Sequence, residues 1–496
     1  MVRHDQGDHS DKPKAALLTA AVQHHQSGDL ATAIRLYRTL IDREPENADA
    51  WHLLGVTAHQ QGDHKLALNL IGTAIELNGA VADYHSNFGM VLLALKLAGR
   101  ADAAFRKAID IDPSSGKALS NLAGLLRRQG DVAAAVDYAK RALRSDDGDA
   151  ETHNNLGNAL MDCGRDQEWL EDAVASYRRA IQLQPDYALA HWNLSLALLT
   201  AGDLTEGFKE MSWRWRWSGF PAHRRHLEKP PLRTDSNIKD KQVLLYAEQG
   251  LGDAIHFVRY ARHIRGLGAR VIVECPLPLV PLIRAAGVAD EVFGEGDEVP
   301  EFDLQAPFLD LPAVCRTDLN NLPDSSPYLA VDPNLVSTWR SRISEYDGFK
   351  IGLNWCGNPE SPVEKFRQLP VSALAALTAV KGVAWFSLQK ELGRSDVPPA
   401  PEALDIIDTG KSPLQETAAL ITALDLVITT DTAIAHLAGA LGKPAWVLLH
   451  QAPDWRWLAE RTDSPWYPTL RLFRQKQPGN WMPVVDDLVN ALKDTV

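Results

Sequence analysis

The sequence has 496 residues, of which 45% are hydrophobic, so it is long enough for more than one globular domain with a buried core. A formal net charge of −13 argues against a general affinity for nucleic acid or anionic lipid. The four cysteines lie far apart without a CxxC pair, which indicates reduced thiols rather than disulfides or a metal site.

The first thirteen residues are polar and mixed in charge, and we expect residues 1–13 to be disordered. They lack the apolar core of a signal peptide, and no later segment has the ~20 apolar residues that a membrane-spanning helix needs. These features predict a cytoplasmic protein without membrane insertion.

Residues 14–217 contain an internal repeat. A proline or another helix-ending residue recurs every 34 residues and then after 38, at Pro45, Gly79, Pro113, Asp147 and Pro185. Glycine or alanine recurs where paired helices must approach closely, and Gly-Asp pairs mark the turns between helices. The pattern predicts an all-α solenoid of helical hairpins, and it resembles the tetratricopeptide repeat (TPR) family over five to six repeats.

Asparagine recurs at one position of four repeats, just before a packing Leu or Phe. These residues are Asn87, Asn121, Asn155 and Asn193. An amide donates and accepts hydrogen bonds, so such a ladder can hold the backbone of an extended polypeptide, as in related superhelical repeats. The same amides could instead cap or bridge neighbouring helices. Because solenoids present a concave groove to partners, we take the asparagines as candidate acceptor-binding residues.

The array ends in an aromatic and basic segment. Three tryptophans alternate with two arginines, at Trp213, Arg214, Trp215, Arg216 and Trp217. A nucleic-acid or sugar platform is one interpretation, but an aromatic cap that seals the last repeat, with arginines stacked on the rings, explains the pattern better. Residues 218–240 are rich in proline and charge without periodicity, which predicts a linker.

From residue 241 onward, apolar strands alternate with helices, which predicts doubly wound α/β structure in two halves, 241–333 and 349–496. The expected strands of the first half are 243–247, 271–274, 290–293 and 303–306. Those of the second half are 351–355, 383–387, 405–408, 425–429 and 445–449. We expect the halves to face each other across a cleft.

A glycine-rich turn follows the first expected strand and opens a helix, in the order Gly250-Leu251-Gly252-Asp253. It lacks the third glycine of the dinucleotide fingerprint and a ribose-binding acidic residue, which disfavours a nicotinamide enzyme. Gly250 and Gly252 are candidates for contact with a phosphate, because such groups bind where a strand turns into a helix. Asp253 could take the proton of an acceptor hydroxyl, or it could simply cap its helix.

A second constellation lies in the other half. A buried strand ends at Thr430, and Asp431, Thr432 and Ala433 open the next helix, which carries His436. The free N–H groups of a helix start, together with the Thr432 hydroxyl, can hold a nucleotide phosphate without a metal.

This segment resembles the motif of heptosyltransferase-type enzymes, the family 9 glycosyltransferases, whose GT-B fold consists of two Rossmann-like halves. The resemblance implies that the Asp-Thr-x-x-x-His stretch binds the phosphates of the donor and that an Asp in the first glycine-rich turn is the general base. The matching positions are Asp253, Asp431, Thr432 and His436. Two features depart from the family: Ala433 replaces the usual glycine, and the first half is short.

Three further residues are candidate donor contacts. Lys365 and Arg367 follow the first strand of the second half, where the family carries a basic phosphate contact; their alternative is solvated loop charge. Gln389 ends the next strand and is expected to face the nucleotide. No Asp-x-Asp metal pair stands out, so we expect neither metal nor cofactor, only a nucleotide-sugar substrate.

The resemblance implies an inverting, metal-independent glycosyltransferase. Its layout is similar to that of O-linked N-acetylglucosamine transferases and of bacterial flagellin glycosyltransferases. This similarity implies a protein Ser/Thr acceptor that the repeats dock, with flagellin as a candidate. The alternatives are a lipopolysaccharide or other glycan acceptor, and a non-catalytic TPR scaffold. Deletion of residues 14–200 is expected to abolish transfer to protein while sparing nucleotide-sugar binding.

Overall fold

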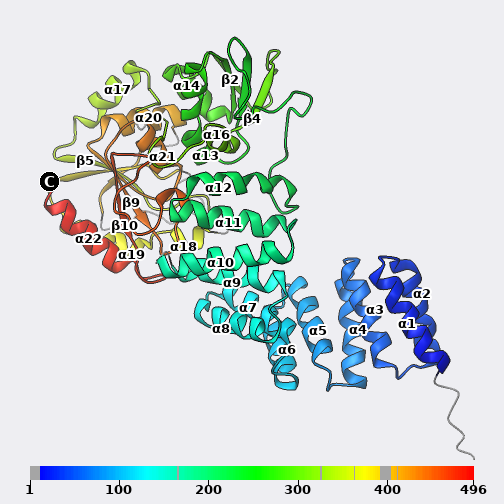
Figure 1. Cartoon of the computed structure of the whole chain (residues 1–496). Helices are drawn as coiled ribbons and strands as arrows, with labels where there is room; N and C mark the ends of the chain where they lie inside the picture. The colour runs from blue at the N-terminus through cyan, green and yellow to red at the C-terminus, as the bar shows by residue number, and fades with distance from the viewer. Residues whose placement is uncertain (1–11, 165–166, 324–326, 362, 391–403, 410–411) are drawn as a thin grey trace, which may run out of the picture. The chain divides into compact units, whose positions relative to one another are not determined.

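The computed structural model describes residues 12–164, 167–323, 327–361, 363–390, 404–409 and 412–496 (Figure 1). The disorder expected for the N-terminus falls mostly on residues 1–11, which lie outside the described residues, and the first helix begins at Lys12. The chain forms two compact units. The first comprises Met1–Cys163 with Arg179–Pro185, and the second comprises Gly164–Arg178 with Asp186–Val496.

The first unit consists of antiparallel helical hairpins (Figure 1). Its helices are α1 (Lys12–Gln26), α2 (Leu30–Arg43), α3 (Ala48–Gln60), α4 (His64–Leu77), α5 (Ala82–Ala94), α6 (Ala98–Ile111), α7 (Gly116–Gln129), α8 (Val132–Ser145) and α9 (Ala150–Cys163). The predicted Gly-Asp turns are confirmed. Asp29, Asp63 and Asp131 each cap the following helix by accepting a backbone N–H, and the preceding glycines have positive φ.

The recurring small residues let paired helices touch. At Gly55 in α3, an added Cβ would lie 3.1 Å from the backbone nitrogen of Ile71 and 3.2 Å from the Cβ of Leu70, both in α4. A larger side chain would push the hairpin apart, which explains the repeat of glycine or alanine at this position.

The last hairpin belongs to the second unit. That unit contains part of α10 (Gln167–Leu183), then α11 (Ala188–Ala201), α12 (Leu204–Met211) and the 3-10 helix η1 (Ser212–Arg216). Side chains of α11 and α12 join the same hydrophobic core as the α/β sheets, namely Leu199, Leu204, Phe208 and Met211. Residues 14–200 therefore include nearly all of α11, so the proposed deletion would remove Leu199 from this core together with the repeats.

The aromatic segment after this hairpin forms the cap that the sequence predicts. The Arg214 guanidinium lies over the Trp215 ring at 4.4 Å, and that of Arg216 lies over Trp213 at 4.4 Å. Trp213 in turn stacks on His191 of α11, with ring centroids 3.7 Å apart. The rings thus cover the end of the last hairpin.

The first half of the α/β region is a four-stranded parallel sheet in the order β3-β2-β1-β4. The strands are β1 (Gln242–Tyr246), β2 (Arg270–Cys275), β3 (Glu291–Gly294) and β4 (Leu304–Pro307). The helices are α13 (Leu251–Phe257), α14 (Arg259–Gly266), α15 (Val280–Ala286) and α16 (Leu311–Val314), with short 3-10 turns η2 (Leu277–Leu279) and η3 (Phe308–Asp310). The expected linker is partly ordered on this sheet, because Pro231 forms a parallel bridge to Gln305 of β4.

The second half is a six-stranded parallel sheet in the order β10-β9-β8-β5-β6-β7. Its strands are β5 (Phe349–Asn354), β6 (Val383–Ser387), β7 (Ile406–Ile407), β8 (Leu426–Thr430), β9 (Ala445–Leu449) and β10 (Leu470–Arg474). The remaining elements are α17 (Pro333–Ile343), α18 (Glu364–Arg367), α19 (Val371–Leu374), η4 (Ala375–Ala379), α20 (Leu414–Ala423), α21 (Ala433–Ala440), η5 (Trp455–Trp457) and α22 (Met482–Lys493). This strand order is the Rossmann order, so the predicted fold class is confirmed.

Two details of the α/β region differ from the sequence prediction. The helix expected after the glycine-rich turn is two helices, α13 and α14, which meet at Val258. Strand β10 was not predicted, because its residues lie in a segment dominated by Trp and Pro.

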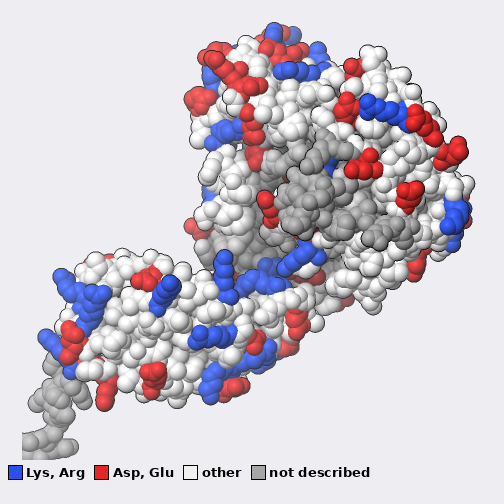
Figure 2. Space-filling view, turned by 180° about the vertical axis from the view of Figure 1, so that it is seen from behind, with Lys and Arg blue, Asp and Glu red and all other residues white. Residues whose placement is uncertain are grey.

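The surface carries both signs of charge. Figure 2 shows acidic and basic side chains interspersed on the visible face of the α/β region. Among the helices described here, none combines the length and the apolar composition that crossing a bilayer requires.

Candidate functional site

The candidate site begins at the point where the strand order of the second half reverses, between β5 and β8. Ligands of open α/β sheets bind outside the carboxyl ends of the strands at such a point. Here β5 ends at Asn354, and β8 is followed by Asp431 and by Thr432, the N-cap of α21. The predicted donor segment therefore lies where the fold class places a nucleotide.

A hydrogen-bond network fixes this corner. Asn354 Oδ1 accepts from the hydroxyls of Thr429 and Thr432, each at 3.0 Å. The Thr432 hydroxyl also accepts the N–H of Ile434 at 3.3 Å, so it caps α21 in addition to any contact with a ligand. Ala433 is the first residue of α21.

Gln389 is buried two residues after the end of β6 and supports the same corner. Its Oε1 accepts from Asn354 Nδ2 at 2.9 Å and from the backbone N–H groups of Trp355 and Cys356 at 3.2 and 3.1 Å. The sequence predicted that Gln389 faces the nucleotide. In the structure its carbonyl oxygen is instead committed to the segment after β5.

The two basic candidates of the loop after β5 have different environments. Arg367 Nε lies 2.5 Å from Glu364 Oε2, and Glu364 also accepts the N–H of Gly357 at 2.5 Å. Lys365 is exposed, with its Nζ 4.7 Å from the centroid of the Phe366 ring. Arg367 is therefore the better candidate for a charge that acts on the site.

Asp431 is buried, and the charge of Arg367 acts on it. Burial raises its pKa to about 6, the charge of Asp454 adds to the rise, and the charge of Arg367 opposes it. Near neutral pH a fraction of Asp431 therefore carries a proton. A neutral carboxyl repels an incoming phosphate less than a carboxylate does.

His436 projects from α21 into a cluster of aromatic side chains. Its Nδ1 lies 3.0 Å from the hydroxyl of Tyr467, which lies 2.9 Å from Nδ1 of His256. Burial lowers the pKa of His436 to about 3, so the ring is neutral at physiological pH. Its expected role at a phosphate is therefore that of a neutral donor, not a cation.

Helices α13 and α21 bring the two halves into direct contact. A Cβ at Gly252 would lie 3.1 Å from Cδ2 of His436 and 3.7 Å from the Cα of Ala433. Gly252 is thus needed for close helix packing, whereas Gly250 is the exposed N-cap residue of α13. This contact joins the predicted base turn to the predicted donor helix.

Asp253 lies in the first turn of α13, with a quarter of its side chain exposed. Arg456 of η5 donates from Nη2 to Asp253 Oδ1 at 2.5 Å and from Nη1 to Asp454 Oδ1 at 2.8 Å. Burial raises the pKa of Asp253, and the positive charge of Arg456 acts against the rise. The hydrogen bond from Arg456 goes to Oδ1 of Asp253.

Arg456 is the residue of the candidate site whose position the sequence predicts least well. The sequence marks Asp454, Trp455 and Arg456 only as a segment that could line a sugar pocket, with packing as the alternative. In the structure the guanidinium is buried, stacks over Trp455 at 4.4 Å and pairs with Asp253. No local signal reveals this pairing, because 203 positions separate the partners.

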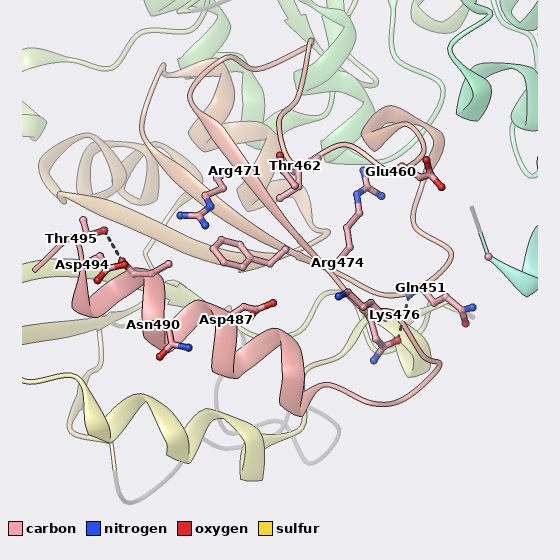
Figure 3. Close-up of a pocket in the computed structure, with 15 residues that line it drawn as sticks. Gln451, Glu460, Thr462, Arg471, Arg474, Lys476, Asp487, Asn490, Asp494 and Thr495 are labelled. Carbon is pink, nitrogen blue, oxygen red and sulfur yellow. Dashed lines mark hydrogen bonds between the residues drawn. The ribbon is translucent and has the colours of Figure 1, made fainter. Parts of the chain in front are cut away.

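A cavity of about 800 Å³ lies elsewhere, between β10 and α22 (Figure 3). It is lined by basic and acidic side chains in equal number: Arg471, Arg474, Lys476, Glu460, Asp487 and Asp494. Such a mixed lining does not favour a strongly anionic diphosphate. It contains none of the residues that the sequence predicts for donor binding.

The asparagines of the first unit bridge neighbouring repeats. Asn87 Nδ2 donates to His52 Nε2 at 2.8 Å, and burial lowers the pKa of His52 to about 4, which leaves that nitrogen free to accept. Asn121 and Asn155 donate to serine hydroxyls of the preceding repeat at 3.4 and 3.5 Å. Asn193 lies in the second unit and is half-buried. Asn87, Asn121 and Asn155 therefore bridge adjacent helices, as one of the two interpretations predicted, and each bridging hydrogen bond uses the side-chain nitrogen.

Family comparisons agree with this architecture. Tetratricopeptide repeat models match residues 18–80, 86–150 and 165–202. A model of glycosyltransferase family 9 (heptosyltransferase) matches residues 401–456, which include β8, α21, β9 and Arg456. The chain joins tetratricopeptide repeats to a glycosyltransferase domain.

The chain is similar to one relative over nearly its whole length and to two others over about a third of it. It is 25% identical over 556 residues to protein FlbA of Caulobacter vibrioides, across 98% of this chain and 91% of FlbA. It is 30% identical over 171 residues to the human protein O-mannosyl-transferase TMTC3, across 34% of this chain and 18% of that protein. It is 26% identical over 155 residues to a probable UDP-N-acetylglucosamine–peptide N-acetylglucosaminyltransferase SPINDLY of Hordeum vulgare, across 31% and 16%.

Proposed function

We propose that this protein transfers a sugar from a nucleotide-sugar donor to a hydroxyl group of a protein acceptor, with inversion and without a metal. The Asp253–Arg456 pair carries the proposal, because it joins a candidate base to the half that holds the donor segment. The family 9 match, which ends at Arg456, supports the same assignment.

The donor is proposed to bind at the start of α21. The N–H groups of this helix start are proposed to bind the diphosphate, with the N–H of Ile434 released from its cap by Thr432, and Arg367 adds a positive charge near Asp431. As the bond between the anomeric carbon and the phosphate oxygen breaks, negative charge grows on the leaving phosphate. N–H groups that already point at the leaving phosphate stabilise the transition state more than the ground state.

The acceptor is proposed to be activated by Asp253. Its carboxylate takes the hydroxyl proton while the oxygen attacks the anomeric carbon from the face opposite the leaving phosphate. Burial alone would favour the protonated, inactive form, and the Arg456 guanidinium favours the ionised form. The pair uses Oδ1, so Oδ2 is the proposed proton acceptor.

The acceptor class rests on the repeats and on the relatives. Two relatives are named as transferases that act on proteins or peptides. We propose a Ser or Thr hydroxyl of a protein, with flagellin as the candidate and the oxygen atoms of the repeat asparagines as polypeptide contacts. A lipopolysaccharide or other glycan acceptor is the alternative.

A turnover assay with a panel of nucleotide sugars tests the proposal, combined with intact-mass analysis of flagellin from cells with and without this protein. We expect a sugar-sized mass difference, and transfer in 10 mM EDTA equal to transfer without it. Asp253→Asn is expected to lower transfer by about 10²- to 10⁴-fold with folding intact. Near-normal transfer by this variant would refute the base assignment, and neither binding nor turnover of any donor would indicate a non-catalytic scaffold.

A further inference from the structure

Arg214 is a completely buried cation in η1, directly after the last helical hairpin. Its Nη2 lies 2.9 Å from Glu248 Oε1 and 2.7 Å from Asp310 Oδ1, and its Nη1 donates to the carbonyl of Met211 at 3.3 Å. A buried ion pair requires accurate geometry to offset the loss of hydration. Arg214 therefore ties η1 to two specific points of the first α/β half.

One of these points controls the turn that carries the candidate base. Glu248 lies between the end of β1 and Gly250, the N-cap of α13. Its side chain is 1% exposed, and its Oε1 also accepts the N–H of Leu309 in η3 at 3.2 Å. Arg214 thus holds Glu248, which lies five residues before Asp253 and two residues before the N-cap of α13.

The same hairpin contacts the turn that carries Arg456. The ring of Phe208 in α12 meets the ring of Trp455 edge to face, with centroids 5.4 Å apart and planes at 87°. The carbonyl of Thr200 in α11 accepts the N–H of Ala459 at 3.1 Å. Trp455 directly precedes Arg456, so the hairpin borders both turns that form the Asp253–Arg456 pair.

We propose that α11, α12 and η1 form a positioning element of the transfer site, which sets the Asp253–Arg456 pair from both sides. The physical reason is that each partner lies on a short turn of a different half. The distance between two separate turns can vary, but α12 and η1, which are consecutive and contact one turn each, fix this distance. The inference rests on the proposed function for its catalytic meaning.

Arg214→Gln tests the first contact, with Arg216→Gln as the matched control. Arg216 lies in the same 3-10 helix but is exposed. We expect Arg214→Gln to lower the kcat of transfer at least tenfold with the donor KM within twofold. The acidic limb of the pH–rate profile should move to higher pH, because Asp253 loses accurate pairing with Arg456. Arg214→Lys should recover part of the loss.

Hydrogen exchange tests the positioning without relying on activity. We expect Arg214→Gln to speed amide exchange at least fivefold in residues 248–257, and Phe208→Leu to do so in residues 454–459, with β5 unchanged. Phe105→Leu, in the core of the first unit, is the control for loss of a buried ring.

The outcomes separate the two proposals. If the wild-type protein binds and turns over no donor, the proposed function fails, while the exchange data still decide the positioning. If Arg214→Gln matches Arg216→Gln in kcat, pH profile and exchange, the positioning element is refuted. A uniform increase of exchange across the whole second unit would also refute it, since this result indicates general destabilisation.

Discussion

Arg456 donates a hydrogen bond to Asp253 although 203 positions separate the two residues. The pair connects η5 of the second α/β half to α13 of the first. Burial raises the pKa of Asp253, and the positive charge of Arg456 lowers it, so without this partner a smaller fraction of the carboxyl would be ionised and able to act as a base. The pair therefore links the geometry of the two halves to the protonation state of the candidate base.

Replacing Arg456 should expose this link. In Arg456→Gln the pKa of Asp253 should rise, because the positive charge that opposes the effect of burial is gone. We expect transfer to fall at least tenfold at pH 7 and to recover in part as the pH rises. The pH–rate profile measures both effects.

The exposed Arg461, which pairs with Asp463, gives the control Arg461→Gln. It should leave the profile unchanged. An unchanged profile in Arg456→Gln as well would show that the ion pair does not tune Asp253.

Asp431 should make the stability of the protein depend on pH in an unusual direction. Its pKa is about 6 in the folded protein and 3.8 for the unperturbed group, so between these values the folded state binds more protons. Stability conferred by the protonated form is therefore lost as the pH rises through this window. Between pH 4 and pH 7, the free energy of unfolding of Asp431→Asn should increase relative to that of the wild type by up to about 3 kcal/mol.

Urea unfolding at four pH values across this window measures the difference. The exposed Asp487 of α22 supplies the control Asp487→Asn. A constant difference between Asp431→Asn and the wild type at every pH would mean that Asp431 does not titrate in this range.

Gly252 should not tolerate even a methyl group. The added Cβ would lie 3.1 Å from His436 Cδ2, so α13 and α21 must separate or shift. We expect Gly252→Ala to lose about 1 to 3 kcal/mol of stability and most of its transfer activity. Thermal unfolding and the transfer assay provide the two measurements.

Gly266→Ala is the matched control, because Gly266 also lies in a helix but nothing surrounds its Cβ position within 4 Å. This variant should gain about 0.5 to 1 kcal/mol from higher helix propensity. Equal behaviour of the two variants would argue against close packing of α13 on α21.

Replacing the repeat asparagines should weaken binding of the protein acceptor and leave binding of the nucleotide-sugar donor unchanged. In Asn121→Ala and Asn155→Ala the lost bonds to serine hydroxyls are long, 3.4 and 3.5 Å, so stability should fall by less than about 1 kcal/mol. We expect the KM for the protein acceptor to rise severalfold while the KM for the donor stays constant. Steady-state kinetics with each substrate varied in turn makes the comparison.

Asn69 is exposed on α4, the second helix of its hairpin, and Asn69→Ala should change neither KM. If the repeat variants lose stability but keep the acceptor KM, these asparagines serve only to bridge adjacent repeats.

The sequence by itself determined the local architecture. Repeats of 34 residues, Gly-Asp turns and apolar strands depend on contacts between near neighbours. Helical hairpins and alternating strands can therefore be predicted from the sequence. The segment from Asp431 to His436 was identified in the same way, since strand, cap and helix follow one another directly. The fold class follows from this order of elements.

Only the tertiary structure decided which distant groups meet. The pairing of Asp253 with Arg456 and the burial of Arg214 against Glu248 depend on packing between elements far apart in sequence. The last hairpin reads as one more repeat, yet Phe208 lies in the core of the α/β region. Periodicity records which face of a helix is apolar, but it does not specify what that face packs against.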